Sequence, residues 1–193
     1  MLQIQTSNNF STPKSANYEQ PLDLLLSCHT KIRHFSSALD KLTDAIQENG
    51  WNDKHITSVE QVRHYFNIAS SAHHQDEEKH LFPAIVALES ISNLNSKSEN
   101  KGENKSKFTN IIHRLIKEHH DSDALWVQLD TLLAERSDDF LTLNKLSKQF
   151  KLDMHRHAQI EDDIIFPYAK KYISKEDFKK MGLAIARRRG IKV

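Results

Sequence analysis

The sequence is poor in the residues that make tight turns and covalent cross-links. Its 193 residues include four glycines, four prolines and a single cysteine, Cys28. Glycine is absent from residues 51–101 and from residues 103–181. Because sandwiches and barrels need many glycine-rich turns, this scarcity argues against an all-β fold and favours long helices. One cysteine excludes an intrachain disulfide, which fits a reducing compartment.

Strong net charge and long apolar segments are also missing. The formal net charge is +1, so the chain as a whole does not resemble a basic nucleic-acid binder. The first 20 residues are polar and lack the apolar core of a signal peptide, and no apolar run approaches the roughly 20 residues of a membrane helix. We therefore expect a cytoplasmic protein that contacts neither nucleic acid nor a membrane. We interpret the Arg187–Arg189 run as a solvated tail.

Helical patterning is present along most of the chain, and its length suits one domain. We expect an all-α fold: an antiparallel four-helix bundle of two helical hairpins over residues 18–172, plus a short C-terminal helix. Pro83 and Pro167 should kink or end their helices, because proline lacks a backbone donor. In the first half we expect a flexible tail (1–17), a helix ending at Gly50, a loop (51–57), and a second helix that is capped by Ser58 and Gln61 and ends near Ser90. A flexible linker (92–107) should join this half to the second, in which we expect helices at about 108–135 and 140–172. Residues 173–193 should form the short C-terminal helix, which starts at Ser174 with Asp177, and a basic tail.

An internal repeat relates the two halves of the chain. FNIASSAHHQDEEKHLFP, residues 66–83, aligns with FKLDMHRHAQIEDDIIFP, residues 150–167. Each copy carries a His-x-x-x-Glu motif followed by Phe-Pro, and the helix before each copy carries a partner histidine. The hairpins are therefore pseudo-symmetric. The matched pairs are His73 with His157, Glu77 with Glu161, and His29 with His119.

The repeated motif has the chemistry of a metal site. Residues four apart on a helix share a face, so the histidine and glutamate of each motif point the same way. Inward-facing side chains of four antiparallel helices can meet at one level, and twelve histidines are available in the chain. Four imidazoles and two carboxylates exceed the four ligands of one tetrahedral zinc and suit two metal ions bridged by the carboxylates. The predicted ligands are His29, His73, Glu77, His119, His157 and Glu161.

This motif set resembles the hemerythrin-like HHE cation-binding domain, over about residues 20–172. The resemblance implies a four-helix bundle with a non-haem di-iron centre, oxo- or hydroxo-bridged, in which Glu77 and Glu161 bridge the two iron ions. Oxygen-carrying hemerythrins have a His-x-x-x-His motif, whereas here Asp123 follows His119 by four residues. The ligand set is thus closer to the bacterial iron–sulfur-centre repair group, although that group often has a cysteine pair and this chain has one cysteine.

For other residues near the predicted site, the sequence leaves alternative roles open. His80 is an extra ligand or a packing residue, and Asp123 is a partner that orients His119 or a surface group. Cys28 is a buried thiol or a redox group. The aromatic residues Phe66, Phe150 and Trp126 belong to the core or control access to the metal pocket. The remaining histidines are interpreted as solvated or interhelical, or as part of a loop: His34, His55, His64, His74, His113, His120 and His155.

Three functions fit these features. The first is a stress-response di-iron protein that binds or reacts with O₂, NO or peroxide, or that serves iron–sulfur-centre repair. The second is an iron- or oxygen-sensing module in which the metal state controls binding to a protein partner. The third is a structural bundle without metal. A redox or protein partner is compatible with the first two.

Overall fold

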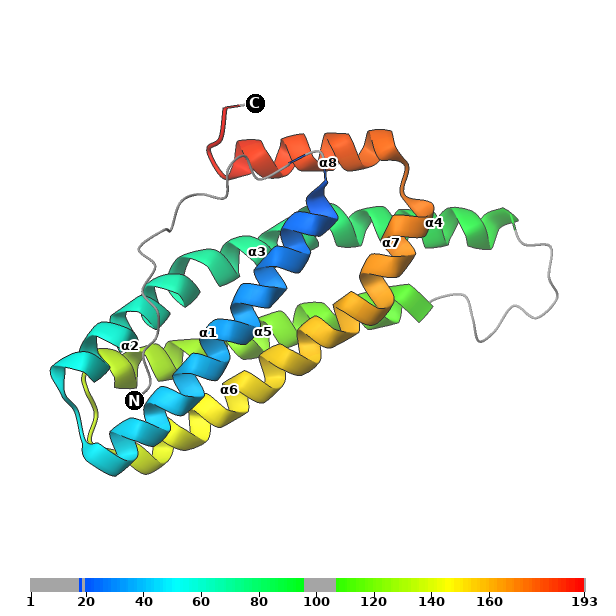
Figure 1. The fold of residues 1–193 in the computed structure, drawn as a ribbon. Coiled ribbons are helices and arrows are strands. Elements are labelled where there is room, and N and C mark those ends of the chain that lie inside the picture. Colours follow the sequence, from blue (N-terminus) through cyan, green and yellow to red (C-terminus); the bar gives the residue numbers. More distant parts are fainter. Residues whose placement is uncertain (1–17, 19, 96–106, 193) are drawn as a thin grey trace.

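The computed structural model describes residues 18, 20–95 and 107–192, and in this part of the chain the regular structure is helical throughout (Figure 1). Three short π-helical segments interrupt the longer helices. The elements are α1 (Pro21–Asn49), α2 (Asp53–Tyr65), η1 (Phe66–Ser70), α3 (Ser71–Asp76), η2 (Glu77–Leu81), α4 (Phe82–Asn95), α5 (Lys107–Ala134), α6 (Phe140–Ile160), η3 (Glu161–Ile165), α7 (Phe166–Tyr172) and α8 (Lys175–Arg188).

The long helices form the predicted all-α bundle, with α1 packed on α2 and α6, and α5 packed on α4 and α6 (Figure 1). Gly50 ends α1 with φ of 70°, a conformation that glycine adopts without strain. Arg136, with φ of 51°, lies in the turn between α5 and α6. None of the described helices combines the length and the apolar character that crossing a membrane requires.

The second long helix begins earlier than the sequence predicts. Asn52 caps α2, because its side chain accepts a hydrogen bond from the backbone N–H of His55 at 3.0 Å. Residues 53–57 are therefore helical, so the expected loop and the cap by Ser58 are both wrong. His55 lies on the first turn of α2 and contacts the carbonyl of Gly50 through Nδ1 at 2.9 Å.

From the sequence, Pro83 and Pro167 are expected to kink or end their helices. Neither proline ends its helix in the structure. A π-helical turn ends two residues before each proline, and the backbone N–H of Phe82 bonds to the carbonyl of Glu77 five residues back. Phe166 makes the same bond to Glu161. The wider turn accommodates the residue that cannot donate, and each π turn begins at a predicted ligand.

The polar segment between the hairpins is shorter than predicted. Residues 92–95 form the end of α4, Lys107 begins α5, and residues 96–106 lie outside the described residues, as does the predicted tail at 1–17. The carboxylate of Glu89 joins the two helices: it accepts hydrogen bonds from the backbone N–H groups of Phe108 and Thr109, both at 2.9 Å. Glu89 thereby satisfies two free donors at the start of α5.

Helix α8 packs back onto the bundle, against α1 and η2. Ser174 caps it as predicted, accepting from the backbone N–H of Asp177. The prediction that Arg187–Arg189 form a solvated tail is wrong for two of the three residues. Arg188 and Arg189 both form ion pairs with Asp76, which is fully buried at the end of α3. A buried carboxylate needs such compensation, and the basic residues supply it.

Two apolar clusters fill the bundle. One contains Phe66, Trp126 and Phe150, whose rings lie 4.8–5.4 Å apart; these aromatic residues are part of the core. The other contains Phe82 and Phe166. Along α1, α5 and the helix of α6 and η3, the buried histidines His29, His119 and His157 lie between the two clusters, so that apolar packing encloses them on both sides. The candidate site therefore lies between the two apolar clusters.

Candidate metal centre

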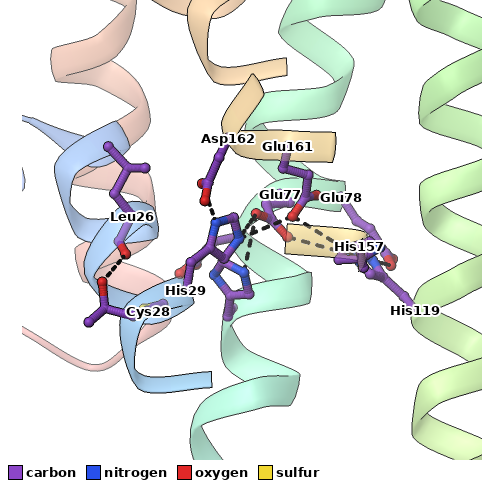
Figure 2. A network of polar contacts seen from close by, with 12 residues as sticks. Leu26, Cys28, His29, Glu77, Glu78, His119, His157, Glu161 and Asp162 are labelled. Carbon is purple, nitrogen blue, oxygen red and sulfur yellow. Dashed lines mark hydrogen bonds and ion pairs between the residues drawn. The ribbon is translucent and has the colours of Figure 1, made fainter. Parts of the chain in front are cut away.

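The structure brings all six predicted ligands together. Their side chains form two overlapping groups of four, in which one ligand atom from each residue lies within 4.8 Å of the others. All six side chains are buried. Figure 2 shows the two carboxylates between His29 on one side and His119 with His157 on the other. The groups are His29, His73, Glu77 and Glu161, and Glu77, His119, His157 and Glu161.

The two glutamates belong to both groups. Oε1 of Glu77 lies 3.3 Å from Nε2 of His73, and its Oε2 lies 3.6 Å from Nε2 of His119. Oε2 of Glu161 lies 3.1 Å from Nε2 of His29 and 3.2 Å from Nε2 of His157. Each carboxylate thus faces histidines of both halves, which is the arrangement of a ligand that bridges two cations.

The donor atoms fit a metal, because the buried polar atoms in the centre lack hydrogen bonds. Among the described residues, both oxygens of Glu77 and of Glu161, and Nε2 of His29 and of His73, have no hydrogen-bond partner. Nε2 of His119 faces Nε2 of His157 at 2.9 Å. Burying carboxylates and imidazoles in this way is costly unless a cation or protons complete the site.

A second set of carboxylates lies behind the histidines. Nδ1 of His29 is 2.6 Å from Asp162, and Nδ1 of His119 is 2.6 Å from Glu78 (Figure 2). Nδ1 of His157 is 3.1 Å from Glu118. A carboxylate at Nδ1 directs the lone pair of Nε2 toward the centre and makes the imidazole a better metal ligand.

Sequence reasoning missed these backing carboxylates. Glu78 and Asp162 directly follow Glu77 and Glu161, so the repeat carries an acidic residue at the same position in both halves. This repeated pair, a glutamate followed by a second acidic residue, is the signal that would have identified Glu78 and Asp162. The third backing group, Glu118, precedes His119, and Cys28 occupies the matching place before His29.

Comparison with known proteins agrees with this geometry. The family model described as the hemerythrin HHE cation binding domain matches residues 20–169. The chain belongs to the hemerythrin HHE cation-binding family. It is also 29% identical over 182 residues to an uncharacterized protein of Haemophilus influenzae (strain ATCC 51907 / DSM 11121 / KW20 / Rd), with 92% of this chain and 94% of that protein covered.

Family membership confirms the resemblance inferred from the repeat, and the two buried His/Glu clusters could hold metal cations. Membership of this family supports metal binding by the bundle.

Two histidines of the cluster, His29 and His157, have raised pKa values and therefore hold their protons strongly. Burial alone would lower the pKa of His29, but the hydrogen bond to Asp162 and the nearby carboxylates of Glu161 and Glu77 outweigh burial and raise it to about 11. Burial would likewise lower the pKa of His157, but the charge of Glu161 and the hydrogen bond to Glu118 raise it to about 10. A metal that binds these imidazoles must displace their protons.

The other two histidines of the cluster, His119 and His73, have lowered pKa values. Burial, together with the neighbouring His74 and His157, lowers the pKa of His119 to about 2. Burial and the charge of His29 lower the pKa of His73 well below its usual value. Both imidazoles are therefore neutral, the form that binds metal.

The two central carboxylates, Glu77 and Glu161, also differ in their pKa values. Burial and the charge of Glu161 raise the pKa of Glu77 to about 8. Burial opposes ionisation of Glu161 as well, but His157 and His29 outweigh it and hold its pKa well below the usual range. The cluster thus carries one firmly ionised carboxylate and one that protonates readily.

The candidates left open by the sequence lie outside the six-residue cluster. Nδ1 of His80 does not join either group of four, and burial lowers the pKa of this half-buried residue. Asp123 does not orient His119, because Glu78 takes that place; its Oδ1 lies 3.6 Å from Nδ1 of His74 instead. Burial raises the pKa of the partly buried Cys28 thiol, which disfavours the reactive thiolate.

Most of the remaining histidines match the interpretation of solvated or interhelical residues. His34, His64, His113 and His120 are exposed. His155 connects α6 to α1 through Ser37 at 3.3 Å. His74 is interhelical as well: it is buried on α3 and stacks on His119 of α5, beside the centre.

Proposed function

We propose that this HHE protein holds two iron ions and binds or reacts with O₂, NO or peroxide, in the oxidative or nitrosative stress response or in iron–sulfur-centre repair. The observation that carries the proposal is the pair of overlapping ligand groups that share Glu77 and Glu161. One group offers His29 and His73, and the other offers His119 and His157, so each ion receives two imidazoles and two carboxylate contacts.

Iron suits this donor set. Mixed imidazole and carboxylate ligation is typical of non-haem iron, and thiolate, which soft metals prefer, is absent from the two ligand groups. Two bound iron ions would supply Lewis acidity and one-electron redox chemistry toward a small ligand. Four protein ligands for each ion are fewer than the six positions of octahedral iron, which leaves places for such a ligand.

The protein's own side chains would orient the ligands, exclude bulk water and restrict access. Asp162, Glu78 and Glu118 fix the imidazoles of three histidines through Nδ1. The rings of Phe166 and Phe82 lie parallel to His29 and His119, at 5.1 and 5.9 Å, and cover the centre on one side. A small cavity between α5 and α6 reaches His157, which favours small ligands over extended substrates.

The test is an anaerobic reconstitution with ferrous iron, followed by separate exposure to O₂, NO and hydrogen peroxide. We expect two iron ions per chain and a visible absorption band that changes with at least one of these ligands. The Glu161→Gln variant should lose the band, because it lacks a bridging charge. A loaded protein whose spectrum is indifferent to all three ligands would contradict the proposed reactivity.

A second function is favoured by one contact. Asp76, which binds Arg188 at the end of α8 and Arg189 directly after it, immediately precedes Glu77, the proposed bridging residue. A conformational change in η2 that depends on the metal state would therefore be transmitted to α8. An iron- or oxygen-sensing module requires such a connection. Limited proteolysis tests this: α8 should be cleaved at different rates in the metal-free and iron-loaded protein, and equal rates would remove the support.

A further inference from the structure

His74 is a buried polar side chain that the ligand cluster does not use. Its exposed fraction is 4%, and neither Nδ1 nor Nε2 has a hydrogen-bond partner among the described residues. A buried imidazole with two unsatisfied nitrogen atoms is unfavourable unless something else completes its hydrogen bonds. The neighbours of His74 show where that partner would lie.

The imidazole of His74 borders the metal centre without belonging to it. Its ring stacks on that of His119, with centroids 3.9 Å apart and planes 9° apart. The ring centroids of His73 and His157 lie 5.9 and 6.1 Å away. His74 is in neither group of four ligand atoms, so it is next to the centre but beyond direct ligation.

Asp123 on α5 is the carboxylate that lies beside Nδ1 of His74. Oδ1 of Asp123 lies 3.6 Å from Nδ1 of His74, and the carboxylate is 56% exposed. A carboxylate beside Nδ1 favours the tautomer that carries its proton there, which leaves Nε2 with a lone pair. Nε2 is buried and has no hydrogen-bond partner among the described residues, and the ring that carries it stacks on His119.

This arrangement exists in one half of the bundle only. In the repeat, Ala158 occupies the place of His74, and Arg33 occupies the place of Asp123. Arg33 binds Asp162 at 2.5 Å, so it serves a backing carboxylate and does not face an extra imidazole. His74 and Asp123 therefore distinguish the side of the centre formed by His119 and His157.

We propose that His74 is the residue that recognises a protonated small ligand in the centre: its Nε2 accepts a hydrogen bond from a water molecule, or another ligand that carries a proton, beside His119 and His157. Asp123 acts as the positioning residue that holds the tautomer. The proposal rests on the proposed function, because it requires a metal-loaded centre. It makes the centre prefer ligands with an O–H group over ligands that carry no proton.

Azide provides the test, since this anion carries no proton and must displace water. The full-length protein is loaded with iron and oxidised, and azide is titrated while the visible spectrum is followed. In His74→Phe, which keeps an aromatic ring against His119, we expect azide to bind roughly three- to tenfold more tightly, as expected for the loss of one hydrogen bond to the displaced water. Asp123→Ala should shift the affinity in the same direction by less.

The control is His64→Phe, the same substitution at an exposed histidine of α2, which should bind azide like the wild type. Because Asp123 is exposed, its variant decides the question if His74→Phe does not fold. Unchanged azide affinity in an iron-loaded His74→Phe or Asp123→Ala protein would overturn the role of His74, as would the loss of one iron per chain in His74→Phe. A wild-type protein that takes up no iron would overturn the proposed function itself.

Discussion

Asp162 holds His29 by a 2.6 Å contact between Oδ1 and Nδ1, while its second oxygen lies 2.5 Å from Arg33. The arginine fixes the carboxylate, and the carboxylate fixes the imidazole. His119 has the equivalent contact with Glu78, also at 2.6 Å. These contacts orient the imidazoles, so that the ligand nitrogen atoms of the centre already face one another.

Removing this support should weaken metal binding without removing a ligand. We expect Asp162→Asn to lower metal affinity about 10- to 100-fold, because His29 loses the group that orients it and increases its basicity. Isothermal titration with Mn²⁺ or anaerobic Fe²⁺ measures the change. The matched control is Asp163→Asn, since that neighbouring carboxylate is exposed and contacts Gln159. Equal affinities of the two variants would contradict the role of Asp162.

Metal binding should strengthen as the pH rises from 6 to 8. His29 and His157, with pKa values raised to about 11 and about 10, carry protons throughout this range, and Glu77, with a pKa raised to about 8, carries one for most of it. A metal must displace these protons, and each displaced proton contributes up to about tenfold in affinity per pH unit. Titration in buffers of different ionisation enthalpy counts the protons, and zero release would contradict this prediction.

The same groups give the metal-free protein the opposite pH dependence. A histidine whose pKa is raised on folding stabilises the folded state fully below its unfolded pKa of about 6.5, and this contribution is lost as the pH rises toward the folded value. Glu77 acts in the same direction up to about pH 8. Chelator-treated protein should therefore unfold at lower urea concentration at pH 9 than at pH 7, and excess metal should reduce that difference.

The ion pairs of α8 should contribute to global stability. In the double variant Arg188→Ala/Arg189→Ala, Asp76 would remain fully buried without a compensating charge. Leaving a buried charge unpaired costs about 3–5 kcal/mol. We expect urea denaturation to show a loss of this size, whereas the exposed neighbour variant Arg187→Ala should change stability by less than about 0.5 kcal/mol. A double variant as stable as wild type would show that α8 does not depend on Asp76.

Glu89 should stabilise the start of α5. It accepts two backbone hydrogen bonds and one from the hydroxyl of Thr109 at 2.5 Å. Glu89→Gln removes the charge that strengthens these bonds, at a cost of about 1–2 kcal/mol. Denaturation of this variant beside Glu135→Gln, an exposed glutamate after the end of α5, measures the difference, and matching midpoints would contradict the prediction.

The helical bundle and the six clustered residues could be predicted because both follow from periodicity. Residues four apart must share a helix face, and a repeat places His73 and His157 at equivalent positions. The start of α2 was predicted wrongly because two capping signals compete there. Asn52 provides a cap one turn before Ser58, and the earlier cap lengthens the helix and satisfies more of its donors.

Long-range contacts set the limit of prediction from sequence. Arg188 and Arg189 resemble a solvated basic tail until the fold brings Asp76, more than 100 residues away, next to them. His74 lies beside a ligand on its helix, and only the packing of α5 decides that its ring is buried against His119. The π turns before Pro83 and Pro167 also depend on tertiary packing, because an isolated helix would end or kink there.

Metal stoichiometry tests the central claim most directly. The full-length protein should be loaded anaerobically with ferrous iron, separated from excess metal and analysed for iron and protein, with Glu77→Gln/Glu161→Gln as the comparison. Two shared glutamates between two histidine pairs predict two iron ions per wild-type chain and a clear loss in the double variant. One ion per chain, or two ions that persist without both bridging charges, would contradict the account.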